Sequence, residues 1–123
     1  MSRPIGRKLR SLHESDAAVG FYCPGCRSLH VLYVKPFMPA RPVWGFNGDG
    51  DSPTFTPSVL ISSNRWTPEV TPENFRRWQK KPWSQTQVPY VCHSFIAAGR
   101  IEFLSDSTHH LAGQTVDLPD MRL

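Results

Sequence analysis

The sequence predicts a mainly β fold, a small β-sandwich or hairpin fold with a zinc-ribbon-like knuckle and one short helix near residues 72–80. Three observations support this prediction. The 123 residues include 12 prolines, which interrupt helix interiors and central strands alike. Short runs of apolar and β-branched residues alternate with turn-forming residues. Residues 23–26 have the sequence Cys-Pro-Gly-Cys, a tight turn that presents two thiolates on one side.

The N-terminal residues 1–17 are predicted to be a basic, flexible arm, followed by a single zinc-stapled β-rich domain over residues 18–123. A chain of this length fits one domain. The net charge is +4, and much of it precedes the first acidic residue, Glu14. Such an arm can contact nucleic acid by Coulomb attraction, and the candidate contacts are Arg3, Arg7, Lys8 and Arg10.

Two hairpins are expected to form the body of the domain. The first has strands over residues 19–22 and 29–34, with the Cys-Pro-Gly-Cys knuckle at its tip. The second has strands over residues 90–96 and 100–104, with Gly99 in the turn. Between them we expect strands at 43–46 and 54–62, separated by a turn at 47–51 that is rich in Gly, Asn and Asp. A last strand is expected at 115–118.

The helix is predicted from its end signals. Thr71 supplies a hydroxyl N-cap, Pro72 fits the first helical position and Glu73 lies in the first turn. Pro82 ends the helix after about two turns.

The three cysteines predict a structural zinc site. Cys23, Cys26 and Cys92 supply three ligands, and an odd number of cysteines in a reducing compartment favours thiolate ligation over disulfides. The four candidates for the last corner are histidines. Because successive side chains on a strand point to opposite faces, His93 should point away from a metal that Cys92 binds. The loop after the second hairpin can fold back, which favours His109 or His110, and His30 is the remaining candidate. A Cys3His site of this kind is closed, without the open position of a catalytic zinc.

A second hypothesis concerns a polar pocket formed by His30, His93 and Asp106. Together with Asp49 and Asp51, these residues could provide a general base or a second metal site. The pocket would make the protein a metal-dependent hydrolase. A histidine that is hydrogen-bonded within a β-rich core is the more frequent alternative for His30 and His93.

The remaining sequence features constrain the location of the protein. No apolar run approaches the roughly 20 residues of a membrane-spanning helix, and no hydrophobic stretch follows the basic start as in a secretory signal. We therefore expect a cytoplasmic protein with no membrane partner.

Several blocks of the chain resemble a family of small proteins from tailed phages and prophages that often carries the label ammonia monooxygenase. The resemblance spans roughly residues 19–119. The residues here show no His or carboxylate cluster of the kind that a copper or diiron oxygenase needs. The matching blocks are residues 21–26 followed by His30, 44–48, 53–58, 92–96, 99–101 and 106–114.

The resemblance implies which histidine is the fourth ligand and what kind of role the protein has. The histidine of the last block falls on His109, whereas His110 takes a position that the family pattern leaves open. Ser107 stands where the family often has cysteine. Relatives occur beside bacterial ubiquitin-like conjugation components, which implies a role in protein interaction.

The function predicted from the sequence is that of a phage-encoded, zinc-binding adaptor without catalytic chemistry. Its metal ligands would be Cys23, Cys26, Cys92 and His109. Its partner would be a protein, either a virion component or a host factor, in the host cytoplasm or incorporated in the virion. The alternatives are the metal-dependent hydrolase and the nucleic-acid-binding protein described above.

Overall fold

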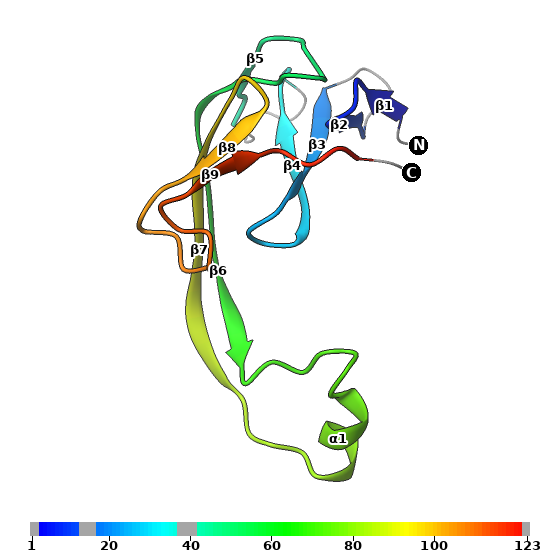
Figure 1. The fold of residues 1–123 in the computed structure, drawn as a ribbon, viewed down its shortest axis with the longest axis vertical. Coiled ribbons are helices and arrows are strands. Elements are labelled where there is room, and N and C mark those ends of the chain that lie inside the picture. Colours follow the sequence, from blue (N-terminus) through cyan, green and yellow to red (C-terminus); the bar gives the residue numbers. More distant parts are fainter. Residues whose placement is uncertain (1–2, 13–16, 37–41, 122–123) are drawn as a thin grey trace.

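Two antiparallel sheets build the protein, and the mainly β prediction is confirmed (Figure 1). The computed structural model describes residues 3–12, 17–36 and 42–121. The first sheet has the strand order β1-β2-β3-β4, in which each strand pairs with its neighbour in sequence. Its strands are β1 Arg3–Ile5, β2 Leu9–Ser11, β3 Ala18–Cys23 and β4 Ser28–Tyr33.

The second sheet has the order β5-β6-β7-β8-β9. The predicted second hairpin and the last strand are both present, but β6 and β7 are longer than expected. Residues 98 and 99 form the tight turn between β7 and β8, with positive φ at both positions. The strands are β5 Gly45–Phe46, β6 Phe55–Thr67, β7 Thr86–Ala97, β8 Arg100–Phe103 and β9 Thr115–Asp117.

The hydrophobic core lies between the two sheets. Phe21 of β3 and Phe55 of β6 contact across the interface, with ring centroids 6.4 Å apart. Phe21, Ile101 and Phe103 are almost completely buried, and each such side chain contributes about 1.5–3 kcal/mol through burial. The knuckle turn between β3 and β4 and the middle of β7 both border this core, because Cys23 and Cys92 belong to the same cluster.

The β6–β7 hairpin extends away from the two packed sheets and carries α1 Phe75–Lys80 beyond its far end (Figure 1). The last six residues of β6 are all exposed. The helix is shorter than the predicted 72–80, because Thr71 and Asn74 form a turn before it. In that turn the Thr71 N–H donates to Asn74 Oδ1 and the Asn74 N–H donates to Thr71 Oγ1. No helix of the described residues is long and apolar enough to cross a membrane.

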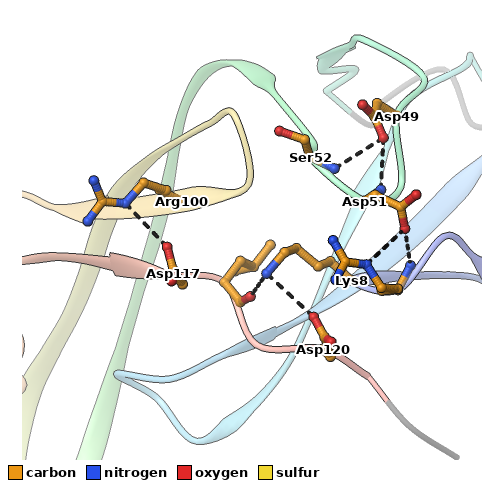
Figure 2. Close-up of polar contacts among 9 residues, drawn as sticks. Lys8, Asp49, Asp51, Ser52, Arg100, Asp117 and Asp120 are labelled. Carbon is orange, nitrogen blue, oxygen red and sulfur yellow. Dashed lines mark hydrogen bonds and ion pairs between the residues drawn. The ribbon is translucent and has the colours of Figure 1, made fainter.

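The prediction of a flexible N-terminal arm is wrong for the part of residues 1–17 that the structure describes. β1 and β2 belong to the first sheet, and Leu9 is fully buried. Two basic residues of this segment, Arg7 and Lys8, contact acidic groups of the same chain. Lys8 Nζ lies 3.5 Å from Asp120 Oδ1 and also contacts the Leu118 carbonyl (Figure 2), and Arg7 Nε lies 3.4 Å from Asp51 Oδ1. Residues 13–16 lie outside the described residues.

Candidate active site and metal centre

A serine, a histidine and an aspartate from three separate segments form one hydrogen-bonded row. His93 on β7 is at its centre. Its Nε2 lies 3.1 Å from Ser58 Oγ on β6, and its Nδ1 lies 3.0 Å from Asp106 Oδ2 in the turn after β8. If Asp106 accepts the Nδ1 proton, the Nε2 lone pair is left to accept the Ser58 hydroxyl proton. This is the connectivity of a catalytic Ser-His-Asp triad.

Local irregularity in β6 positions the serine. The pairing of β6 with β7 shifts between Phe55 and Val59, so three residues of β6 face a single residue of β7. Bulges of this kind re-aim a side chain and are frequent beside active sites. The Ser58 carbonyl is held by the indole Nε1 of Trp44 at 3.2 Å. Ser58 is therefore fixed on its carbonyl side while its hydroxyl faces His93.

Ser107 attaches the aspartate-bearing turn to β7. The His93 N–H donates to Ser107 Oγ at 3.0 Å, and the Ser107 hydroxyl donates to the His93 carbonyl at 3.1 Å. Thr108 makes the same kind of paired contact with the backbone of Val91. Because these bonds hold residues 107 and 108 against the strand, Asp106 is held beside the imidazole.

The histidine is more shielded than the aspartate. The side chain of His93 is 24% exposed and that of Asp106 is 59% exposed. Water can therefore reach the Asp106 carboxylate. Because water screens charge, the electrostatic attraction between this carboxylate and the imidazole is weaker than it would be for a buried carboxylate.

The three cysteines do converge, as the sequence predicts, and His30 joins them. One ligand atom from each of Cys23, Cys26, His30 and Cys92 lies within 4.8 Å of all the others. The Sγ atoms of Cys23 and Cys92 are 3.9 Å apart, close to the roughly 3.8 Å that separates two sulfurs on a zinc tetrahedron with 2.3 Å bonds. All three cysteines are free thiols. These residues could bind a metal ion.

The protonation of the cysteines fits a set of metal ligands. A hydrogen bond with Cys92, opposed by burial, lowers the pKa of Cys23 to about 4. The same bond and burial raise the pKa of Cys92, and burial raises the pKa of Cys26. Thiolate is the form of cysteine that binds a metal, so a bound cation would displace the remaining thiol protons. The Tyr90 hydroxyl donates to Cys26 Sγ at 2.8 Å, and burial raises the pKa of Tyr90, which keeps it a donor.

Two histidines border the knuckle with a buried nitrogen that lacks a partner. The Nε2 atoms of His30 and His109 are both buried and unpaired among the described residues. His109 lies over Gly25, where a Cβ would meet its ring at 2.4 Å, and its Nδ1 accepts the Leu111 N–H. The structure groups His30, and not His109, with the cysteines. The assignment of His109 as the fourth ligand stays a prediction.

The predicted polar pocket of His30, His93 and Asp106 is not formed as one set. His30 belongs with the cysteines, whereas His93 and Asp106 belong with Ser58. The physical reason is the alternation along β7, where Cys92 points into the core and His93 to the opposite face. The expectation that His93 faces away from a metal bound by Cys92 fits this arrangement.

Ser58 is the candidate functional residue that the sequence analysis missed. It carries no local signature such as Gly-x-Ser-x-Gly, because the serine lies in a bulge and not in a strand-to-helix elbow. The one available signal was its position in the Pro-Thr-Phe-Thr-Pro-Ser block at residues 53–58.

The fold and the triad together define a β-rich protein with a serine-hydrolase type of site. A family model described as bacterial ubiquitination-like system serine protease (BubE) matches residues 4–104. The chain belongs to this family. Neither the search of curated proteins nor the search of solved structures gave a match.

Family membership corrects the function predicted from the sequence. The prediction of an adaptor without catalytic chemistry is wrong, because the family is one of serine proteases. The association with ubiquitin-like conjugation that the resemblance implied agrees with the family description, whereas an origin in phages stays a prediction.

Proposed function

We propose that this protein is a serine protease in which Ser58 is the nucleophile, His93 the general base and Asp106 the residue that orients the base. The observation that carries the proposal is the continuous row of hydrogen bonds from Ser58 Oγ through the His93 ring to Asp106. Membership of the BubE family supports it. The substrate would be a protein of a ubiquitination-like system, and the reaction would take place in the bacterial cytoplasm, where the three thiols stay reduced.

The reaction follows from the geometry. Ser58 Oγ attacks the carbonyl carbon of the substrate while His93 Nε2 takes its proton, and Asp106 stabilises the imidazolium that forms. His93 then gives the proton to the leaving amine, and the acyl group stays on Ser58. Water attacks this ester with His93 again acting as base, which releases the second product and restores the serine.

Mixed tryptic peptides from a bacterial lysate provide the test of this assignment. We expect the protein to generate new peptide ends that mass spectrometry detects, and Ser58→Ala to abolish them. Ser63→Ala is the matched control, since Ser63 lies on the same strand and takes no part in the triad. Retained cleavage in Ser58→Ala would contradict the assignment.

We further propose that the metal is zinc and that its role is structural. The donor set of three sulfurs and one imidazole nitrogen is typical of closed zinc sites. Bound zinc would hold the knuckle turn against β7 and so fix the backbone next to His93. Elemental analysis of purified protein should give zinc that is lost in His30→Gln and kept in His109→Gln. The reverse result would assign the fourth ligand to His109.

A further inference from the structure

Among the described residues, the outer edge of β6 is an unpaired strand edge that begins beside Ser58, the proposed nucleophile. β5 pairs with β6 only through Gly45↔Thr56 and Phe46↔Phe55. Beyond these pairs β6 continues to Thr67, and within residues 3–12, 17–36 and 42–121 it has a neighbouring strand, β7, on one side only. In Figure 1 this part of the β6–β7 hairpin has no third strand along it. An edge of this kind presents a row of backbone N–H and C=O groups.

The hydrogen bonds on the far side of β7 identify which residues of β6 point their backbone groups toward the open edge. The backbone N–H and C=O groups of His93 and Val91 bond to residues 104–108, away from β6. Within an antiparallel pair, a residue whose groups point outward faces a partner whose groups also point outward. The partners of His93 and Val91 are Leu60 and Ser62.

This alternation continues along the hairpin. Pro89, which lacks an N–H, pairs with Asn64, and Trp66 follows two residues later. In the described part of the chain, the backbone groups of these outward-facing residues have no hydrogen-bond partner. They are Leu60, Ser62, Asn64 and Trp66.

The face of the sheet that carries the triad is also apolar beside this edge. Leu60 is 57% exposed and Phe95 is 45% exposed. Leu60 is opposite His93, and Phe95 lies two residues from His93 on the same strand, so both side chains share the face of the imidazole. A chain lying along the edge would place alternate side chains over this apolar surface.

We propose that the substrate binds as an added β-strand along the β6 edge, with its backbone bonded to Leu60 and Ser62 and its scissile bond at Ser58. This inference rests on the proposed function. The occupant is an extended segment of a polypeptide substrate, because only a chain with its own N–H and C=O groups satisfies the alternate groups of the edge. The first outward-facing residue lies two residues from Ser58, about 7 Å along a strand.

Proline substitutions test the inference without disturbing the β6–β7 ladder. Leu60→Pro and Ser62→Pro each remove an N–H that points to the open edge, and proline is tolerated at such positions. Leu60→Ala and Ser62→Ala keep the N–H, so the difference between the two substitutions isolates the backbone group. The probes are a small alkyl fluorophosphonate, which reacts with the serine without spanning the edge, and the mixed tryptic peptides of a bacterial lysate.

We expect each proline variant to cleave peptides roughly tenfold more slowly than its alanine counterpart, the effect of losing one hydrogen bond in the complex. Labelling of Ser58 by the fluorophosphonate should be unchanged, which also shows that the variants fold.

Equal cleavage by the proline and alanine variants, or a parallel loss of labelling and cleavage in both proline variants, would overturn the inference. So would a protein that is labelled at Ser58 but cuts no peptide, because an edge that pairs with backbone accepts extended chains of many sequences. Failure of wild-type labelling at Ser58 would instead overturn the proposed function.

Discussion

The two faces of β7 carry two different kinds of site on adjacent residues. Cys92 is 1% exposed and points into the core beside the knuckle cysteines, whereas His93 points to the opposite face and bonds to Ser58 and Asp106. The inner site has the donor set of a structural metal centre. The outer site has the geometry of hydrolytic chemistry. One strand can therefore couple the two sites, since any contact that fixes the backbone of Cys92 also fixes the backbone of His93.

The largest expected effect is on the outer face. His93→Ala should lower peptide cleavage by up to about 10⁶-fold, since loss of the general base removes most of the contribution of a triad. The melting temperature should change little, because His93 lies outside the core. Steady-state kinetics and thermal unfolding measure the two quantities. Val91→Ala, which alters the same face two residues away, should keep far more activity, and equal losses in both variants would show that His93 has no special role on this face.

The exposed aspartate should matter less than the histidine. Asp106→Asn should lower kcat by about 10²–10⁴-fold, because the amide favours the wrong imidazole tautomer but the carboxylate is already open to water. Asp117→Asn is the control, since Asp117 is an exposed partner of Arg100 at 3.4 Å (Figure 2). Full activity in Asp106→Asn would remove Asp106 from the triad.

On the inner face we expect a loss of stability. Cys92→Ser should release the metal and destabilise the fold by about 3–5 kcal/mol, because a ligand that joins distant segments contributes its binding energy to folding. Chemical unfolding with and without a chelator measures the loss. A chelator should destabilise the wild type and leave Cys92→Ser unchanged. Wild-type protein that is indifferent to chelation would show that metal does not contribute to the fold.

The smallest expected effect on stability and activity comes from Ser107, which bonds to the backbone of His93. Ser107→Ala removes the hydroxyl that bonds to the backbone N–H and C=O of His93 and should cost about 1–3 kcal/mol of stability. A moderate loss of kcat should accompany it, because Asp106 is then held less firmly. Ser105→Ala, an exposed neighbour, should leave both quantities unchanged. A stability loss without any change in kcat would limit Ser107 to a structural role.

A region of this protein can be predicted from the sequence when the residues that determine it are close together in the chain. The knuckle hairpin was predictable because Cys23 and Cys26 are three residues apart, and the turn at Gly99 because a positive φ favours glycine. The first two strands were missed because Arg3, Arg7 and Arg10 resemble a solvated tail. In the structure, the single apolar side chain of Leu9 is buried in the core.

The triad could be predicted only in part. The sequence predicts that His93 and Asp106 share a polar pocket with His30, as a general base or a second metal site, and does not place Ser58 with them. The pairing of β6 with β7 and its irregularity between Phe55 and Val59 bring Ser58 to His93, and no local pattern in the sequence encodes that register. The sequence therefore indicates the metal site that includes Cys92 on the inner face, but it does not indicate the contact between His93 and Ser58 on the outer face.

The role of Ser58 as the nucleophile is tested most directly by the reaction of the native protein with a fluorophosphonate, followed by intact mass measurement and mapping of the modified residue. We expect one adduct per chain, located on Ser58 and absent in His93→Ala. An unreactive protein, or an adduct on a residue other than Ser58, would contradict it.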